Sequence, residues 1–455
     1  MTSIGNRTFS NCGLISVIIP DGVTSIGEGV FDNCRDLTSV TIPESVTSIG
    51  DNAFYFCDRL TSITIPESVA IIGDRAFSEC FHLTSIAIPS HVTSISSGVF
   101  SNCRCLSSVT IPEGVTTIGY NAFGGCTGLK SITIPKSVKS IEDRAFFCCG
   151  LISVDIPEGV TSIGGYAFND CHSLESVTIP ESVTSIGSNA FSGSGLISVD
   201  IPGSVKSIGD FAFRSCRELG TITINEGVAS IGNGAFEVCD NLGLVNFASI
   251  KALCMIDFKS ERSNPLSYAH HLFINGVKTT EVIIPESVTS IRSYAFSGCT
   301  NLTSIMIPES VTSIRSYAFS GCTNLTSIMI PESVTSIEKT AFNGCDGITA
   351  VYYAAKKPLS FSSDIFSKTI YRKATLYVPM EAINTCVKTD PWKNFRKIWN
   401  YDFSGIADVI SDLDEDAPCE IFNLNGVKVG DSFDTLASGL YIISQGNKRK
   451  KIIVE

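Results

Sequence analysis

The cysteines are the residues whose type and spacing most suggest chemistry. The chain has 455 residues and 18 cysteines, and thirteen of these lie three residues after a phenylalanine, mostly at steps of 22 or 23 residues. Thiols can form disulfides, bind metals or act as nucleophiles. The thirteen are Cys12, Cys34, Cys57, Cys80, Cys103, Cys126, Cys149, Cys171, Cys216, Cys239, Cys299, Cys322 and Cys345.

This spacing favours free, buried thiols over disulfides. Stacked strands lie about 5 Å apart, which is within the Cα range of a disulfide. However, side chains in register point in parallel, and Ser194 replaces the cysteine of one repeat without removing an obvious partner. A free cysteine behaves as a small hydrophobic residue. We therefore predict an interior ladder of reduced cysteines.

The other candidate residues for metal binding or catalysis are few. His270 and His271 are two of only five histidines, but neighbours in an extended segment point to opposite faces, and no cysteine or acidic pair completes a metal set. No G-x-S-x-G, H-E-x-x-H or phosphate-loop motif occurs. Residues 286–308 and 309–331 are identical, whereas a catalytic site needs residues in a unique geometry. We predict no metal, no cofactor and no enzymatic activity.

The element that must position these residues is a repeat, well represented by Leu37–Cys57, L-T-S-V-T-I-P-E-S-V-T-S-I-G-D-N-A-F-Y-F-C. Val40 and Ile42 are two apart, which places both on one face of a strand that the following proline ends. A second short strand follows, Gly50 allows a tight bend, and A-F-x-x-C forms one helical or 3-10 turn. A period of 22–23 residues is the signature of a solenoid.

The apolar positions of the repeat predict the core. One coil cannot bury its apolar side alone, so successive coils must stack. The residues that represent this interior ladder are Phe54, Cys57, Phe77, Cys80, Phe123 and Cys126.

The repeat resembles the BspA-like leucine-rich repeat proteins, whose coils carry the same I-P…V-x-x-I-G-x-x-A-F-x-x-C pattern. The resemblance covers about residues 1–350. The repeat of this chain lacks the asparagine corner of the commoner leucine-rich repeat. It implies a right-handed solenoid. It also implies an exported bacterial protein, often at the cell surface, that adheres to host proteins or to other cells.

Composition narrows the class further. Charged residues make up 17% and hydrophobic residues 44% of the chain, which is not the composition of a disordered protein. A net charge of -12 argues against a nucleic-acid partner. No apolar run of about 18 residues exists that would span a membrane. The first residues already lie inside a repeat, so we expect the natural chain to start upstream, and no signal peptide is visible.

Four regions are expected along the chain: a solenoid over 1–350 with an irregular insertion at 246–281, a cap over 351–400, an acidic linker over 401–417, and a small β module over 418–455. The insertion contains a helix-like run over 250–258 and an Asn-Gly hairpin turn at 275–276. An ordinary irregular coil is favoured there over a ligand loop.

The only two tryptophans, Trp392 and Trp399, lie in the expected cap. With Phe395 and Ile398 they form an apolar face that suits the open end of a solenoid. A tryptophan-lined carbohydrate site is the alternative.

The last 50 or so residues resemble the C-terminal sorting tails of proteins exported by a type IX-like route. Those tails are small β-sandwiches with a G-[LI]-Y-[IV] strand, as in Gly439–Ile442, and a lysine-rich hairpin, as in Lys448–Lys451. From the residues alone, only a small antiparallel β module follows.

The positions at which the copies differ are the candidate binding residues. Between the two inward residues of the first strand most repeats carry threonine, and the exceptions include isoleucine and methionine, which would form an exposed apolar stripe. A row of acidic residues follows the prolines, and we favour a role in solubility over steering of a basic partner. The candidates are Asp155, Asp200, Ile283, Met306, Met329, His270 and His271.

These observations predict a β-rich leucine-rich-repeat solenoid with a small C-terminal β module. The function we infer is that of an extracellular or cell-surface protein that binds a host or bacterial protein or glycan without catalysis. A passive spacer or surface-layer component is one alternative, and a glycan-processing enzyme is a second. The sequence leaves the oligomeric state open.

Overall fold

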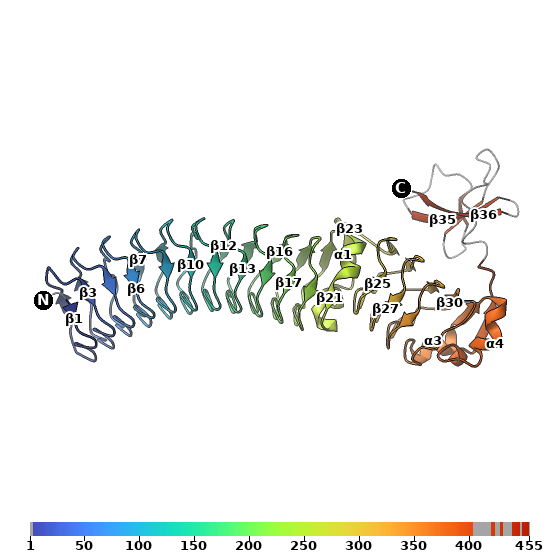
Figure 1. Ribbon diagram of the computed structural model, residues 1–455, viewed down its shortest axis with the longest axis horizontal. Helices are drawn as coiled ribbons and strands as arrows, with labels where there is room; N and C mark the ends of the chain where they lie inside the picture. Colours follow the sequence, from blue (N-terminus) through green and yellow to red (C-terminus); the bar gives the residue numbers. More distant parts are fainter. Residues whose placement is uncertain (1–2, 404–419, 424–427, 431–438, 446–447, 455) are drawn as a thin grey trace. The chain divides into compact units, whose positions relative to one another are not determined.

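The computed structural model describes residues 3–403, 420–423, 428–430, 439–445 and 448–454. The chain divides into two compact units, Met1–Val277 and Lys278–Glu455, here called unit 1 and unit 2. Within each unit, coils of 22 or 23 residues stack so that equivalent strands pair in parallel (Figure 1). The predicted β-rich leucine-rich-repeat solenoid is confirmed.

In unit 1 the first strand of each coil follows the repeat leucine. In β4, Val40 is buried while Ser39 and Thr41 are exposed, as the two-residue spacing predicts. Val40 pairs in register with Val17 of the preceding coil. These strands are β2 (Ser16–Ile18), β4 (Ser39–Thr41), β7 (Ser85–Ala87), β9 (Ser108–Thr110), β12 (Ser153–Asp155), β14 (Ser176–Thr178), β16 (Ser198–Ile201), β18 (Thr221–Ile224) and β20 (Leu244–Phe247).

The second strand of each coil is two residues long and buries its second residue, an isoleucine, except in β1, where Ile4 is half-buried. These strands pair with one another in parallel, as Ile49 does with Ile26. They are β1 (Ser3–Ile4), β3 (Ser25–Ile26), β5 (Ser48–Ile49), β6 (Ile71–Ile72), β8 (Ser94–Ile95), β10 (Thr117–Ile118), β11 (Ser140–Ile141), β13 (Ser162–Ile163), β15 (Ser185–Ile186), β17 (Ser207–Ile208) and β19 (Ser230–Ile231).

The A-F-x-x-C segment is a run of turns, and the expected helical or 3-10 turn does not form at residues 51–57. Asn52 and Phe56 have φ values of 54° and 59°, which breaks a helix. The N–H groups of Asn52, Phe54 and Phe56 instead donate to carbonyls of the next coil at 2.8–2.9 Å. The intervening N–H groups close turns within the coil. Alternate residues therefore bond between coils, so the turn segment itself stacks.

Gly50 is required for a different reason from the one expected. It does not have a positive φ, so it does not supply a left-handed bend. A Cβ built on it would lie 2.8 Å from the backbone of Gly27 and Glu28 in the preceding coil. Glycine at this position permits close packing of the backbones of neighbouring coils.

The phenylalanines and cysteines of the ladder lie in the interior of the stack. The Phe54 and Phe77 rings stack with centroids 5.2 Å apart, and the Phe54 carbonyl accepts both the N–H of Cys57 and the thiol of Cys80, at 3.3 and 3.2 Å. The cysteine thus satisfies the second lone pair of a buried carbonyl. The same thiol bond to the preceding coil is formed by Cys34, Cys57, Cys103, Cys126, Cys149, Cys171, Cys216, Cys239, Cys322 and Cys345.

Every cysteine in the described part of the chain is a free thiol. Burial raises the pKa of the Cys80 thiol to about 12 and that of the Cys57 thiol further still. Ser194, the exception to the ladder, is buried, and its hydroxyl lies 3.3 Å from the Cys216 sulfur. A serine can therefore take the place of the thiol.

The segment expected as an irregular insertion builds a coil with helices in place of turns. Helix α1 (Ile250–Met255) falls in the predicted helix-like run, and β21 (Asp257–Phe258) and β22 (Leu272–Ile274) extend the two strand series. The 3-10 helix η1 (Glu261–Ser263) and α2 (Leu266–Ala269) lie between them. Asn275 and Gly276 have positive φ and lead into β23 (Val277–Lys278), which confirms the hairpin turn.

Unit 2 repeats the same architecture and then departs from it. Its four-stranded sheet continues beyond the regular coils into residues 350–400, where helices replace the turns. Its elements to residue 400 are β24 (Glu281–Ile283), β25 (Ser290–Ile291), β26 (Ser304–Met306), β27 (Ser313–Ile314), β28 (Ser327–Ile330), β29 (Ser336–Ile337), β30 (Ala350–Tyr353), α3 (Lys368–Lys373), β31 (Thr375–Val378), η2 (Met380–Ala382), α4 (Ile383–Cys386), η3 (Trp392–Asn394) and β32 (Lys397–Asn400).

The two tryptophans of the expected cap have different environments. Trp392 is fully buried, stacks on Tyr353 at 4.1 Å and donates from Nε1 to the Leu359 carbonyl at 2.9 Å. Phe395 is also buried. Trp399, in contrast, is 63% exposed, because it occupies the outward position of β32. The prediction that both tryptophans pack over the last coil is therefore wrong for Trp399.

The C-terminal strands form one antiparallel sheet in the order β34-β33-β35-β36. They are β33 (Glu420–Asn423), β34 (Lys428–Gly430), β35 (Gly439–Gln445) and β36 (Lys448–Val454). Antiparallel pairing agrees with the expected small β module. A sandwich, a sorting role and the domain boundaries at 350, 400 and 417 stay predictions. Most of the acidic linker lies outside the described residues.

Candidate binding groove

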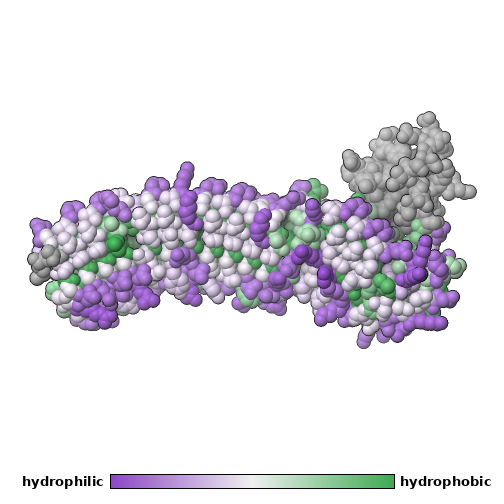
Figure 2. Space-filling model, in the orientation of Figure 1, coloured by the Kyte–Doolittle hydropathy of each residue, from purple (hydrophilic) through white to green (hydrophobic). Residues whose placement is uncertain are grey.

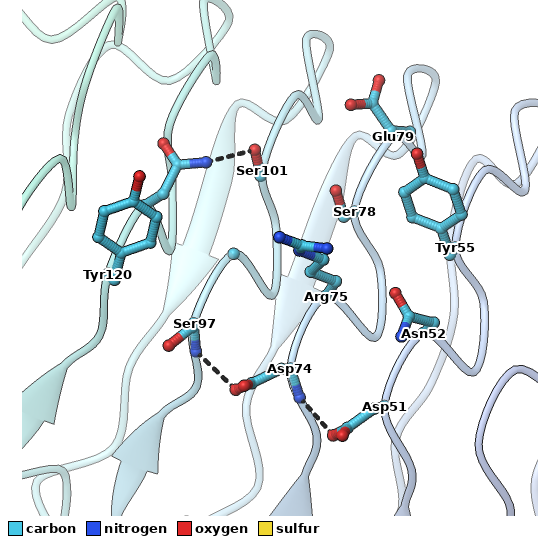
Figure 3. Close-up of a pocket in the computed structure, with 12 residues that line it drawn as sticks. Asp51, Asn52, Tyr55, Asp74, Arg75, Ser78, Glu79, Ser97, Ser101 and Tyr120 are labelled. Atoms are coloured by element: carbon cyan, nitrogen blue, oxygen red, sulfur yellow. Dashed lines mark hydrogen bonds between the residues drawn. The ribbon is translucent and has the colours of Figure 1, made fainter.

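Unit 1 presents two kinds of outward surface. We call the outward residues of both strand series and of the turn joining them the strand side, and those of the segment from the repeat glycine to the repeat cysteine the turn face. Figure 2 shows that much of the visible surface of unit 1 is pale, as expected of serine and threonine. A groove of about 390 Å³ crosses the turn face over residues 51–121 (Figure 3). Its size falls in the range of small-molecule sites.

Small residues of two successive coils form the floor of the groove. The position directly after the repeat phenylalanine is Tyr55 in one coil and then Ser78 and Ser101. Both serines are buried, and Gly98 lies beside them, so together they line the bottom. Tyr120, which is 45% exposed, lies at the other end. Two tyrosines therefore bound a floor of small residues.

The carboxylates of the groove are fixed by the stack. Asp51 Oδ1 accepts the N–H of Asp74 at 2.8 Å, and Asp74 Oδ1 accepts the N–H of Ser97 at 3.0 Å. The second oxygen of each carboxylate has no partner among the residues that the structure describes. Glu79 accepts from Asn102 at 2.7 Å through one oxygen only. These side chains are held in place yet keep hydrogen-bonding capacity for a ligand.

Arg75 is the cation of the groove. Figure 3 shows its guanidinium between Tyr55 and Tyr120. The guanidinium forms no hydrogen bond or ion pair with any residue in the described part of the chain. The φ of Arg75, 54°, is a conformation that asparagine adopts at the equivalent position, 52. An arginine is therefore not required there by the backbone.

A separate cluster of arginine and aromatic side chains lies directly next to the repeat cysteines of the same coils. Arg35 lies over the Phe56 ring at 4.5 Å, and Arg104 lies over the Phe81 ring at 4.9 Å. The Phe56 and Phe81 rings meet edge to face at 5.4 Å. Arginine and aromatic residues are enriched where proteins bind partners. This cluster is therefore a second candidate contact surface beside the turn face.

The strand-side aspartates predicted from sequence lie elsewhere. Asp155 accepts from the Thr178 hydroxyl at 2.7 Å, and Asp200 accepts from the Asn225 amide at 2.9 Å. Each is bonded to a neighbouring coil on the exposed surface, and neither lines the groove. The structure does not bring them together with the groove residues.

The two histidines follow helix α2 of unit 1. His270 ends the helix with a φ of 60°, and His271 Nδ1 is buried without a hydrogen-bond partner among the described residues. Within the described ranges, no group of three or more histidine, cysteine, aspartate or glutamate side chains is arranged to hold a metal ion.

The residues of the apolar stripe predicted for unit 2 occupy outward strand positions, where Ile283 is exposed and Met306 and Met329 are half-buried. Ile283 pairs with Met306, and a second run adds three aromatic residues that the sequence reasoning left out of the stripe. The Tyr352 and Tyr377 rings stack at 4.8 Å, and Tyr401 packs edge to face on Tyr352 at 5.0 Å. The second run, in register, is Met329, Tyr352, Tyr377 and Trp399.

The groove itself was missed by the sequence reasoning, which compared the outward position of the first strand and the position after the proline but not the turn positions. The signal lay beside the A-F pair. There the copies differ in size and charge, with Tyr55, Ser78 and Ser101 at one position and Tyr120 at another.

The repeat is also recognisable by comparison. The family described as BspA type leucine rich repeat region matches residues 2–126, 94–196, 139–261 and 268–387. The chain belongs to this family. No protein with curated annotation matches it. Among the residues described, no helix is long and apolar enough to cross a membrane.

Several solved structures are similar to this BspA-type chain. A leucine-rich repeat protein from Bacteroides ovatus is 27% identical over 88% of each chain, with a TM-score of 0.49. A leucine rich cell surface protein from Faecalibacterium prausnitzii is 32% identical over 77% of this chain and 83% of that one, with a TM-score of 0.38. A leucine-rich repeat protein from Eubacterium ventriosum is 26% identical over 73% and 82%, with a TM-score of 0.37.

Proposed function

We propose that this BspA-type protein is a non-catalytic binding protein of the bacterial surface or exterior. It recognises a protein or glycan partner through outward side chains of its coils. The observation that carries the proposal is the groove on the turn face of unit 1, where the side chains of Tyr55, Arg75 and Tyr120 serve no bond of the stack. Side chains that the fold does not require, gathered in a concave site with several polar groups, make this groove the candidate binding site.

The location is part of the proposal. It rests on the resemblance of the repeats and of residues 418–455 to exported proteins, with that C-terminal module acting as a sorting tail. The histidine pair and the apolar stripe of unit 2 are further candidate contact surfaces, whereas the strand-side aspartates are a competing candidate for the same partner. An exposed apolar stripe of this kind often marks a contact site.

Binding of the full chain to immobilised extracellular-matrix proteins and to intact bacterial and epithelial cells tests the proposal. We expect saturable binding that weakens at least tenfold when Tyr55→Ser, Arg75→Asn and Tyr120→Ser are combined. Each replacement is a residue that other coils carry at the same position, so the fold should persist.

A chain that is folded by circular dichroism and binds none of these surfaces would instead favour the spacer alternative. Turnover of a glycan or peptide that a point mutation abolishes would overturn the non-catalytic assignment.

A further inference from the structure

We propose that the groove between Tyr55 and Tyr120 binds a neutral oligosaccharide of two or three pyranose residues. This inference deepens the proposed function and rests on it, because it names the ligand class of one surface. The groove spans four successive coils, which at about 4.8 Å per coil gives roughly 14 Å of length. Such a length suits a short sugar chain better than a single ring.

The tyrosines at the two ends provide apolar contact with a polar edge. A pyranose presents C–H groups on its faces, and an aromatic ring with its negative π face attracts them. Neither tyrosine is needed by the stack, since Ser78 and Ser101 occupy the position of Tyr55 in the following coils. Tyr120 likewise stands where neighbouring coils carry Asp74 and Ser97.

The groups between the tyrosines match the hydroxyls of a sugar. A hydroxyl both donates and accepts hydrogen bonds. Arg75 offers donors, and Asp51 and Asp74 each offer an oxygen beyond the one that accepts a backbone N–H. Because those inter-coil bonds fix the two carboxylates, little side-chain entropy is lost when a ligand binds.

The charges of the groove disfavour ionic ligands of either sign. The groove is lined by three carboxylates, Asp51, Asp74 and Glu79, and by one guanidinium. Three negative charges and one positive charge give its lining a formal charge of -2. This charge repels sialylated or sulfated glycans. Arg75 in turn lies between the tyrosines, where a lysine or arginine of a basic peptide would have to pack. A neutral, hydroxyl-rich ligand meets neither penalty.

The test uses the full chain on an array of neutral oligosaccharides of two to four residues, with sialylated and sulfated glycans and an oligolysine peptide as comparisons. Hits are then measured by titration calorimetry. Arg75→Asn and Tyr55→Ser should each weaken binding at least tenfold. Two matched controls, Arg144→Asn and Phe147→Ser, change the same repeat positions outside the groove and should stay within twofold.

Tyr120→Ser gives a second readout if either groove variant fails to fold, and it should also weaken binding at least tenfold. The inference is overturned if no neutral oligosaccharide binds, if only charged glycans or oligolysine bind, or if the control variants lose as much affinity as the groove variants. If the chain captures a matrix protein but binds no oligosaccharide of the array, this inference is wrong and the proposed function still holds.

Discussion

The strand side and the turn face of unit 1 differ in what their side chains do for the stack. On the strand side, the Ser68 hydroxyl donates to the Val46 carbonyl of the preceding coil at 2.7 Å, and the Thr47 hydroxyl donates to the Thr24 carbonyl at 3.1 Å. The same bonds recur in other coils. Serine and threonine there are explained by stacking alone. On the turn face, stacking does not explain the side chains of Tyr55, Arg75 and Tyr120.

This difference teaches where a repeat protein can carry a ligand site. A strand position must suit a pleated surface and bond to its neighbours, which favours one residue type copied through the array. A turn position bonds mainly through its backbone, as Asn52 and Phe56 show, so its side chain is free to vary. We infer that ligand contacts are placed more easily where backbone bonds provide most of the stacking.

The largest effect should come from a residue beneath both faces. Phe100 is 1% exposed and stacks between Phe77 and Phe123 at 5.9 and 5.5 Å. We expect Phe100→Ala to lower the free energy of unfolding by about 3–5 kcal/mol, because it leaves a cavity in the interior. Urea unfolding measures this.

The control for that variant is Thr110→Ala on the strand side, which should change stability by no more than about 0.5 kcal/mol. Equal losses in the two variants would show that the strand side contributes as much to stability as the interior, and the division between faces would fail.

High pH should unfold the stack through its interior. Burial raises the pKa of Cys80 and Cys171 to about 12 and that of Cys216 to about 11, from 9.0. The folded-state pKa exceeds the unfolded one, so the stabilisation is complete below pH 9 and is lost as the pH rises toward 11–12. Each such thiol lowers the free energy of unfolding by up to about 1.4 kcal/mol per pH unit above 9, until its folded-state pKa is reached. Urea midpoints at pH 7.5, 9 and 10 measure the loss.

Two variants separate this effect from general alkaline repulsion. Cys80→Ser, which copies the natural serine at position 194, should reduce the pH dependence by the share of one thiol. Cys105→Ser should leave it unchanged, because Cys105 is exposed. A midpoint that does not move between pH 7.5 and 10 would contradict the buried-thiol account.

Much of the fold could be predicted because the interior is periodic. The spacing of Val40, Phe54 and Cys57 determines which side chains turn inward, and the equivalent residues are buried in most coils. The backbone of the turn could not be predicted this way. The residues with positive φ in the turns include Asn52, Arg75 and Cys148. The residue type therefore does not predict the left-handed conformation.

The candidate site could be predicted less well. The groove is formed by side chains of four coils. Because Tyr55 and Tyr120 are far apart in the sequence, the sequence alone did not show that they belong to one site. Trp399 shows the same limit, since its alternation along β32 decides that it faces solvent. The apolar composition of the segment predicted that Trp399 packs on the last coil, whereas the alternation of side chains along β32 places it on the exposed surface.

A smaller effect compares one residue from each surface directly. We expect Ser68→Ala on the strand side to cost about 0.5–1.5 kcal/mol, because it removes a bond to the Val46 carbonyl. Tyr120→Ser on the turn face should stay within about 0.5 kcal/mol. Urea unfolding of the two variants beside the parent chain decides the order. If Tyr120→Ser proved the more destabilising, the tyrosine would belong to the stack and the case for a ligand would weaken.

The smallest expected effect belongs to the strand-side aspartates. Asp155→Thr and Asp200→Thr together restore the threonine that most coils carry, and each removes only one exposed hydrogen bond. We expect the free energy of unfolding to change by no more than about 0.5 kcal/mol, and partner binding to stay within twofold in the assay that weakens with Tyr55→Ser, Arg75→Asn and Tyr120→Ser. The opposite result, with binding lost in the aspartate pair and kept in the turn-face variant, would place recognition on the strand side. The sequence-based prediction of Asp155 and Asp200 as ligand contacts would then replace the groove.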